Sequence, residues 1–247
     1  MASLKPANPV FVALDTPSLN DATNLAAKLA DHVGGLKLGL EFFSAHGPKG
    51  VQQVQRASEL PIFLDLKFHD IPNTVASAVR AVCQLGVYMI NVHASGGRAM
   101  MEAAVKAADD TVHELAVARP LIIAVTVLTS MDANDLGETG VAASPADHVR
   151  RLAALTKASG LDGVVCSPQE AAALKSELGA GFKLITPGVR PAWSAANDQK
   201  RIMTPEDALS AGADYLVIGR PITAAADPAA AAARIAAEIR PYIKTSG

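Results

Sequence analysis

Short runs of aliphatic residues recur along the whole chain and alternate with longer, more polar stretches. Most of the runs are dense in Val, Ile and Leu and do not alternate with polar residues, as in parallel strands that are covered on both faces. Successive runs begin 21 to 41 residues apart. The pattern predicts eight strands, at Val10–Leu14, Gly35–Leu40, Pro61–Leu66, Tyr88–His93, Leu121–Val127, Asp162–Cys166, Lys183–Thr186 and Asp214–Ile218.

Four of the intervening stretches open with an oxygen-bearing residue followed by proline. The side-chain oxygen can accept hydrogen bonds from the first free backbone N–H groups, and proline needs no N–H at the first helical position. An Asp or Glu in the first turn of three of them also complements the helix dipole. The pattern predicts helices that begin at Ser144-Pro145, Ser167-Pro168, Thr204-Pro205 and Asp227-Pro228, the last ending near Ile239.

Eight strands that alternate with helices favour a (β/α)₈ barrel, the TIM barrel, and a length of 247 residues is typical of one such domain. A doubly wound open sheet is the alternative, but no G-x-G-x-x-G follows the first strand, which weakens its dinucleotide-binding form. We expect residues 1–247 to form a single barrel domain, with residues 1–8 as a loose lead-in and Lys244–Gly247 as a frayed end. The segment Ala133–Ser144 has no pattern that we can interpret.

Composition and charge narrow the class of protein. Hydrophobic residues make up 50% of the chain and charged residues 19%, which excludes a disordered chain. The net charge of −2 and the pI of about 6.3 give no basic surplus for nucleic-acid or anionic-membrane binding. No signal peptide, membrane-spanning run or disulfide framework is recognisable, and Cys83 and Cys166 have no metal-binding spacing. A soluble, cytoplasmic, globular protein is therefore expected.

Charged residues stand at the ends of the first three predicted strands. Asp15 ends the first, Lys37 lies in the second, and the third ends in L-D-L-K-F-H-D, with Asp65, Lys67 and Asp70. In a regular strand, residues i and i+2 share a face about 6.6 Å apart, so Asp65 and Lys67 are predicted to point together into the barrel mouth. A lysine flanked by carboxylates stays protonated and suits a cation that stabilises a carbanion and then donates a proton. A purely structural ion pair is the alternative.

A second group of residues predicts a phosphate site in the loops after the seventh and eighth strands, T-P-G-V-R-P and I-G-R-P. Barrels often bind phosphate there. Gly188 and Gly219 let the backbone approach an anion, and Arg220 offers a forked set of cationic donors. The long segment Gly188–Met203 is predicted to form a lid over the site. An ordinary surface loop is the alternative.

The remaining candidate residues are predicted to have mainly supporting or structural roles. His69 is predicted to orient its neighbours, and His93 either lines the mouth or makes a structural hydrogen bond. Cys83 is predicted to be a small core residue and Trp193 to pack in or over the lid. No H-x-x-x-H or H-E-x-x-H spacing exists, and the carboxylates are matched by lysines, so no metal site is expected.

These motifs together resemble the orotidine 5′-phosphate decarboxylase family, which catalyses the last step of de novo UMP synthesis. The resemblance runs from V-A-L-D at 12–15 to V-I-G-R-P-I-T at 217–223, and its most specific part is D-L-K-F-H-D-I-P-N-T at 65–74. L-K-L-G at 36–39, T-V-L-T-S at 126–130 and T-P-G-V-R-P at 186–191 also match in order.

The resemblance implies a (β/α)₈ homodimer that uses no metal or organic cofactor and acts on orotidine 5′-monophosphate. By this resemblance Lys67 protonates C6 within a network of Asp65, Asp70 and Lys37. Asp70 and Thr74 reach into the partner subunit's site. The other implied contacts are Asp15 and Lys37 with the ribose, Thr129 near the pyrimidine, and Arg190, Gln199, Gly219 and Arg220 with the phosphate.

Three rivals stay open at this point. Sugar-phosphate enzymes of the same superfamily, acting on 3-keto-gulonate 6-phosphate or hexulose 6-phosphate, share D-x-K-x-x-D but use Mg²⁺ and an acidic residue on the second strand. Lys37 stands there in this sequence, which argues against them. A phosphosugar isomerase needs a general base at a strand end, and none stands out. A phosphate-binding barrel without catalysis leaves Lys67 and its carboxylates unexplained.

Overall fold

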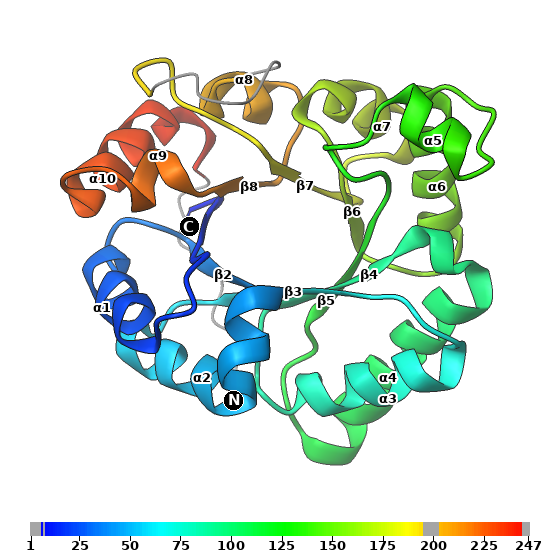
Figure 1. Cartoon of the computed structure of the whole chain (residues 1–247), viewed down its shortest axis with the longest axis horizontal. Helices are drawn as coiled ribbons and strands as arrows, with labels where there is room; N and C mark the ends of the chain where they lie inside the picture. Colours follow the sequence, from blue (N-terminus) through cyan, green and yellow to red (C-terminus); the bar gives the residue numbers. More distant parts are fainter. Residues whose placement is uncertain (1–5, 7, 195–202, 244–247) are drawn as a thin grey trace.

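The eight strands form the inner wall of the molecule. The computed structural model describes residues 6, 8–194 and 203–243. Each strand pairs in parallel with the next, and β1 pairs with β8 through Phe11 and Val217, so the sheet closes into a barrel (Figure 1). The strands are β1 (Val10–Ala13), β2 (Gly35–Gly39), β3 (Ile62–Phe68), β4 (Met89–His93), β5 (Leu121–Val125), β6 (Gly163–Val165), β7 (Lys183–Pro187) and β8 (Tyr215–Ile218).

The strand predictions are confirmed, since every observed boundary lies within two residues of the predicted one. The pairing of β1 with β8 excludes the open doubly wound sheet. The predicted (β/α)₈ barrel is therefore the fold of this chain.

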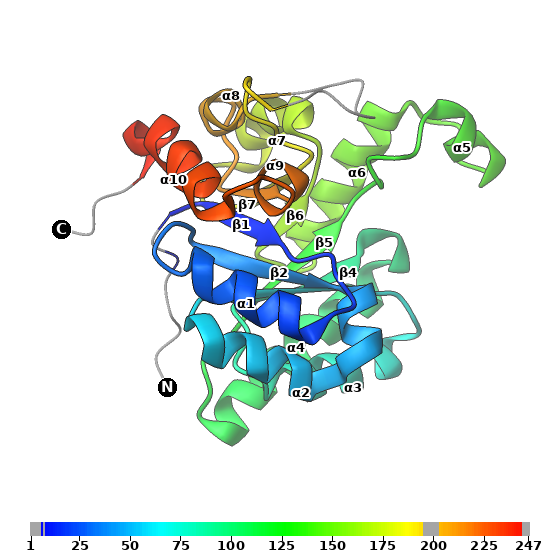
Figure 2. The same cartoon turned by 60° about the vertical axis from the view of Figure 1, so that its left-hand side comes forward.

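Helices surround the barrel, as the two views show (Figures 1 and 2). They alternate with the strands along the chain. They are α1 (Leu19–Leu29), α2 (Leu40–Ser58), α3 (Pro72–Cys83), α4 (Arg98–Leu115), α5 (Ala133–Glu138), α6 (Pro145–Ala158), α7 (Ala171–Leu178), α8 (Pro205–Ser210), α9 (Arg220–Thr223) and α10 (Pro228–Glu238).

Three of the four predicted helix starts are confirmed in detail. Ser144, Thr204 and Asp227 each accept a hydrogen bond from the backbone N–H three residues further on, and proline follows each of them. The fourth start differs, because Ser167 caps a single 3₁₀ turn and α7 begins only at Ala171.

The segment without an interpretable pattern contains the short helix α5. The carboxylate of Asp132 accepts hydrogen bonds from the N–H groups of Asn134 and Asp135, and the Asp135 carboxylate accepts one from the N–H of Asp132. This reciprocal cap explains why a helix of six residues begins at Ala133.

The apolar core lies in two layers. One layer fills the barrel interior, and the other fills the space between the strands and the helices. Leu64 and Leu66 of β3 belong to the outer layer, whereas Phe63 belongs to the inner one. The prediction that these leucines face the helices is therefore confirmed, and Asp65 falls on the face of the strand that Phe63 shares.

Three of the helix-to-strand turns at the amino end of the barrel are alike. In each, a glycine with positive φ is followed by one apolar residue and then by the residue whose N–H begins the pairing with the preceding strand. Glycine adopts this left-handed conformation without a steric penalty. The glycines are Gly86, Gly160 and Gly212, and the pairing residues are Tyr88, Asp162 and Asp214.

The two ends of the described chain meet at this same end of the barrel. Pro6 and Asn8, before β1, line one cavity of about 350 Å³ together with Tyr242 and Ile243, which follow α10. In the part of the chain that the structure describes, no helix combines the length and the apolar character needed to cross a membrane.

Candidate active site

Four charged side chains from three neighbouring strands form one row at the carboxyl end of the barrel. The Lys37 Nζ of β2 lies 2.9 Å from Oδ1 of Asp15, which follows β1, and 3.6 Å from Oδ2 of Asp65 on β3. The Nζ of Lys67, near the end of β3, lies 2.7 Å from Oδ1 of Asp65. The row therefore alternates carboxylate and ammonium, and it joins four of the residues singled out in the sequence.

Burial is greatest in the middle of the row. The side chains of Lys37 and Asp65 are 10% and 12% exposed, whereas that of Lys67 is 29% exposed. Burial raises the pKa of Asp65, but the charges of Lys37 and Lys67 and hydrogen bonds from Lys67 and Asn91 outweigh it and hold this pKa below its usual value. Asp65 is therefore a carboxylate at neutral pH that keeps both ammonium groups paired.

The backbone at Lys67 departs from a regular strand. Its φ is 51°, in the left-handed region, and the pairing of β3 with β4 passes from Leu64–Ile90 to Phe68–Val92. Three residues of β3 thus stand opposite one residue of β4, which is a β-bulge. The two side chains do meet, with 2.7 Å between Nζ and Oδ1, but the regular strand spacing predicted between them is wrong, because the bulge interrupts it.

Asn91 is a residue of the site that the sequence analysis did not single out. It lies in the middle of β4, is fully buried, and contacts both members of the Asp65–Lys67 pair. A signal was present in the sequence, because an amide inside the apolar run M-I-N-V-H must find hydrogen-bond partners once it is buried.

Asp70 and Thr74 lie outside the row. Both are exposed, and the Asp70 carboxylate accepts a hydrogen bond from the N–H of Ile71 at 2.6 Å instead of pairing with Lys67. Thr74 lies in the first turn of α3. Ile71, between them, has 67% of its surface exposed, the largest fraction among the exposed large hydrophobic residues that the structure describes. Within one chain the Asp70 carboxylate therefore does not contact the Lys67 ammonium.

The predicted phosphate residues follow β7 and β8. Gly188 has a φ of 77°, and the N–H of Arg190 donates to the carbonyl of Met203, so the two ends of the predicted lid segment meet. The Arg190 side chain is buried, with an exposure of 3%, whereas Arg220 is exposed at the first position of α9. Because β7 and β8 are neighbours, both arginines stand at adjacent strand ends.

Two further residues of this region, Gln199 and Gly219, are predicted to contact the phosphate. Gln199 lies outside the residues that the structure describes. Gly219, directly before α9, has a φ of −108°, so it does not need glycine's freedom at positive φ. A Cβ at Gly219 would meet its nearest neighbour, Ala13, at an ordinary 3.6 Å.

Other predicted residues flank the mouth. Thr129 lies in an exposed turn after β5, which ends at Val125, two residues earlier than predicted. The rings of His69 and His93 lie 5.6 Å apart, and burial, with the charges of His69 and Lys67, lowers the pKa of His93. Among the described residues, no group of three or more His, Cys, Asp or Glu is arranged to hold a metal ion.

Trp193 and Cys83 are packed as structural residues. The Trp193 Nε1–H donates to Glu238 of α10 at 2.6 Å, and the Arg234 guanidinium lies 4.4 Å from the indole ring. The start of the predicted lid segment is thus attached to the last helix. Cys83 is 1% exposed, which confirms the prediction of a core residue.

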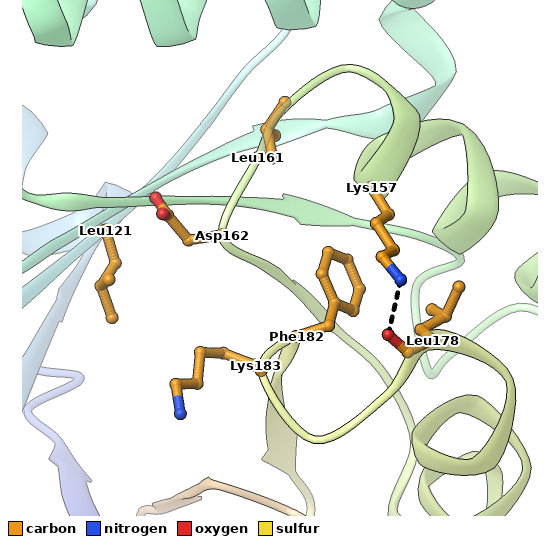
Figure 3. A pocket seen from close by; sticks show the side chains of 8 residues that line it. Leu121, Lys157, Leu161, Asp162, Leu178, Phe182 and Lys183 are labelled. Atoms are coloured by element: carbon orange, nitrogen blue, oxygen red, sulfur yellow. Dashed lines mark hydrogen bonds between the residues drawn. The ribbon is translucent and has the colours of Figure 1, made fainter.

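A cavity of about 440 Å³ lies at the opposite end of the barrel, between the starts of β5, β6 and β7. Its lining includes two lysines whose ammonium groups already have partners. Lys157 donates to the carbonyl of Leu178 at 2.8 Å, as Figure 3 shows, and Lys183 pairs with Asp214 at 3.2 Å. Catalytic groups of a TIM barrel lie at the carboxyl ends of the strands, so this cavity is not the candidate site.

One family model matches most of the chain. The model described as "Orotidine 5'-phosphate decarboxylase / HUMPS family" matches residues 8–235, which is most of the chain. The chain belongs to this family. All described residues of the charged row, and both arginines, lie within the matched range.

Individual members of the family are similar over almost their whole length. The orotidine 5'-phosphate decarboxylase of Rhodospirillum rubrum is 65% identical over 232 residues, covering 94% of each chain. That of Chromobacterium violaceum is 55% identical, covering 96% of this chain and 93% of its own. The solved structure of orotidine 5'-phosphate decarboxylase from Lactobacillus acidophilus is 35% identical, with a TM-score of 0.83 over 96% of this chain and 100% of that one. Membership in this family makes the chain an enzyme, a carboxy-lyase.

Proposed function

We propose that this chain converts orotidine 5′-monophosphate to UMP and CO₂, without a metal or organic cofactor. The observation that carries the proposal is the row of Asp15, Lys37, Asp65 and Lys67 at the carboxyl end of the barrel. The family and the names of its close members support the choice of substrate.

In the proposed step, the bond between C6 and the carboxylate carbon breaks, and its electron pair stays on C6. CO₂ leaves, and the Lys67 ammonium, held beside Asp65, gives a proton to C6. The neutral lysine then recovers a proton from solvent. A fixed cation aimed at the developing charge lowers the barrier without any rearrangement during the reaction, which is electrostatic preorganisation.

The rest of the substrate is assigned to the neighbouring strand ends. Asp15 and Lys37 bind the ribose, Thr129 lies near the pyrimidine, and the phosphate is bound by Arg190, Gln199, Gly219 and Arg220. Binding energy at the remote phosphate then positions C6 against Lys67. The buried Arg190 and the exposed Arg220 stand at adjacent strand ends, which supports this assignment.

We also propose a homodimer in which Asp70 and Thr74 complete the partner's site. The exposure of both residues supports it, as does the absence of an ion pair between Asp70 and Lys67 within one chain. The exposed Ile71 would be covered by the partner. An Asp70→Asn variant mixed with Lys67→Ala tests this, because a shared site predicts some activity in mixed dimers of two nearly inactive variants.

The Mg²⁺-dependent sugar-phosphate enzymes of the superfamily are the alternative. The position of Lys37 disfavours them, since its ammonium lies between the carboxylates of Asp15 and Asp65, where a metal would need an acidic ligand.

The test of the function is a spectrophotometric assay of orotidine 5′-monophosphate loss in the presence of EDTA. Turnover by the folded protein is expected, and no turnover would overturn the proposal. A requirement for Mg²⁺ would favour the alternative.

The phosphate assignment has its own test. Arg220→Ala removes the exposed guanidinium and is expected to raise KM by at least about tenfold, since a charge-assisted hydrogen bond is lost. Arg98→Ala, on the outer helix α4, is the matched control. An unchanged KM in Arg220→Ala would refute the phosphate role.

A further inference from the structure

The side chain of Asn91 bridges the backbone and the side chains of the catalytic pair. Its Oδ1 accepts a hydrogen bond from the backbone N–H of Lys67 at 2.8 Å, and its Nδ2 donates to Oδ1 of Asp65 at 2.7 Å. An N–H can only donate and a carboxylate can only accept, so these two partners fix the orientation of the amide. Asn91 is fully buried, so losing either bond would leave a polar group without water.

Asn91 also stands opposite the interruption in the pairing of β3 with β4. It is the single β4 residue opposite the bulge formed by residues 65–67. The bulge interrupts the regular pairing there, and the Asn91 amide supplies the acceptor that the Lys67 N–H uses. Lys67 also carries a φ of 51°, which an L-residue rarely adopts unless its surroundings hold it there.

We propose that Asn91 is a positioning residue for the decarboxylation: by holding the left-handed backbone of Lys67 and the carboxylate of Asp65 together, it aims the Lys67 ammonium at C6. The proposal rests on the proposed function, in which Lys67 is the proton donor. Asn91 itself lies beneath the pair and acts through it.

The proposal predicts that substitution of Asn91 lowers kcat and leaves KM almost unchanged. Asn91→Ala frees the bulge and the Asp65 carboxylate, and a displacement of the ammonium by about 1 Å lowers kcat by about 100-fold. KM stays close to the wild-type value, because the ribose and phosphate contacts lie on other strands. The bond from Asn91 is also one cause that holds the pKa of Asp65 down, so the acid limb of the kcat/KM profile moves to higher pH in the variant.

Asp162→Ala is the matched control. Asp162, just before β6, also accepts a hydrogen bond from a backbone N–H of the neighbouring strand, that of Ile122 at 2.7 Å, and pairs with a charged side chain, Arg119. It lies at the opposite end of the barrel. Both variants lose a cross-strand bond and melt at a lower temperature, but only Asn91→Ala loses kcat.

The experiment measures kcat, KM, the pH profile and the melting temperature of the wild type and the variants, with Lys67→Ala alongside. A kcat in Asn91→Ala equal to that in Asp162→Ala, or a loss confined to KM, overturns the positioning role. If Asn91→Ala does not fold, Asn91→Asp decides, since it keeps the volume and the acceptor but turns an oxygen toward Asp65. A kcat at least about tenfold below wild type in that variant supports the proposal, and an unchanged kcat overturns it.

Failure of the proposed function gives a different result. In that case the wild type does not consume orotidine 5′-monophosphate, or Lys67→Ala remains active, and the role of Asn91 falls with it. Active wild type, inactive Lys67→Ala and unaffected Asn91 variants would reject the positioning role alone.

Discussion

The two ends of the barrel carry similar groups of charges with different partners. At the amino end, Asp214 accepts hydrogen bonds from the backbone N–H of Leu184 and from Lys175, and Asp162 is bound in the same way by Ile122 and Arg119. At the carboxyl end, the hydrogen bonds that Asp65 receives come from side chains.

This difference separates a charge cluster that pairs with backbone from one that pairs with side chains and is proposed to be catalytic. Each amino-end carboxylate accepts a hydrogen bond from the backbone of the preceding strand. It therefore helps to fix the register between the two strands. Asp65 instead pairs with the ammonium of Lys67, whose side chain is 29% exposed. Alternating charges alone therefore do not distinguish the two ends of the barrel, whereas the partners of the carboxylates do.

The largest expected effect is the loss of catalysis in Lys67→Ala. Removing both the cation and the proton donor lowers kcat by at least about 10⁴-fold, the product of the usual contributions of electrostatic stabilisation and general acid catalysis. The circular dichroism spectrum stays that of the wild type. Steady-state kinetics check the loss, and a kcat within tenfold of wild type would remove Lys67 from its proposed role.

Asp214→Ala should destabilise the amino end of the barrel and leave kcat almost unchanged. It leaves two lysines and the N–H of Leu184 without their carboxylate, and it lowers the free energy of unfolding by about 2–3 kcal/mol while kcat changes by less than about twofold. Glu177→Ala, which removes the exposed pair with Arg150, is the control and should change little. Urea denaturation and the activity assay decide, and a large fall in kcat would contradict the division between the two ends.

A comparison of Lys67→Gly with Lys67→Ala measures how much the left-handed backbone at residue 67 lowers the free energy of unfolding. Alanine keeps the steric strain at a φ of 51°, whereas glycine does not, so the glycine variant should be more stable by about 1 kcal/mol. Both variants are expected to be inactive, and both lack the ammonium, so the comparison isolates the backbone. Equal urea midpoints would show that the surroundings, and not the residue, bear the strain.

The smallest effect concerns the acid side of the stability profile. The pKa of His93 is lowered by burial and by its cationic neighbours, so between its normal pKa of about 6.5 and its lower folded value only the unfolded chain binds this proton. Stability should therefore fall as the pH drops through about 6.5, and less steeply in His93→Asn. His113→Asn, at an exposed position of α4, controls for the loss of a histidine. Identical slopes in wild type and His93→Asn would exclude this contribution.

Most of the fold could be predicted because each of its signals is local. The aliphatic runs mark strands covered on both faces, and Ser144, Thr204 and Asp227 mark helix starts with their own side chains. The exception is the predicted helix start at Ser167, where the local sequence fits two kinds of helix. Ser167 caps a 3₁₀ turn as readily as an α-helix, which the sequence does not distinguish.

The charged row could be predicted from strand ends, whereas its geometry could not. The sequence L-D-L-K-F has the period of a regular strand. It gives no sign that Lys67 is left-handed or that its N–H binds Asn91, which is 24 residues away in the chain. The amino-end cluster has the same residue types, and only the backbone hydrogen bonds reveal its role. Whether Asp70 acts on a partner's site depends on a second chain.

The meeting of Pro6 and Ile243 in one cavity has a practical consequence for engineering. The described chain enters and leaves the fold at the amino end, with the thickness of the barrel between these points and the mouth. A tag or a fused domain attached there sits on the far side from the charged row. A short linker between the two points would also allow circular permutation, with new termini opened in the exposed turn at Gly179–Gly181, which lies outside every strand.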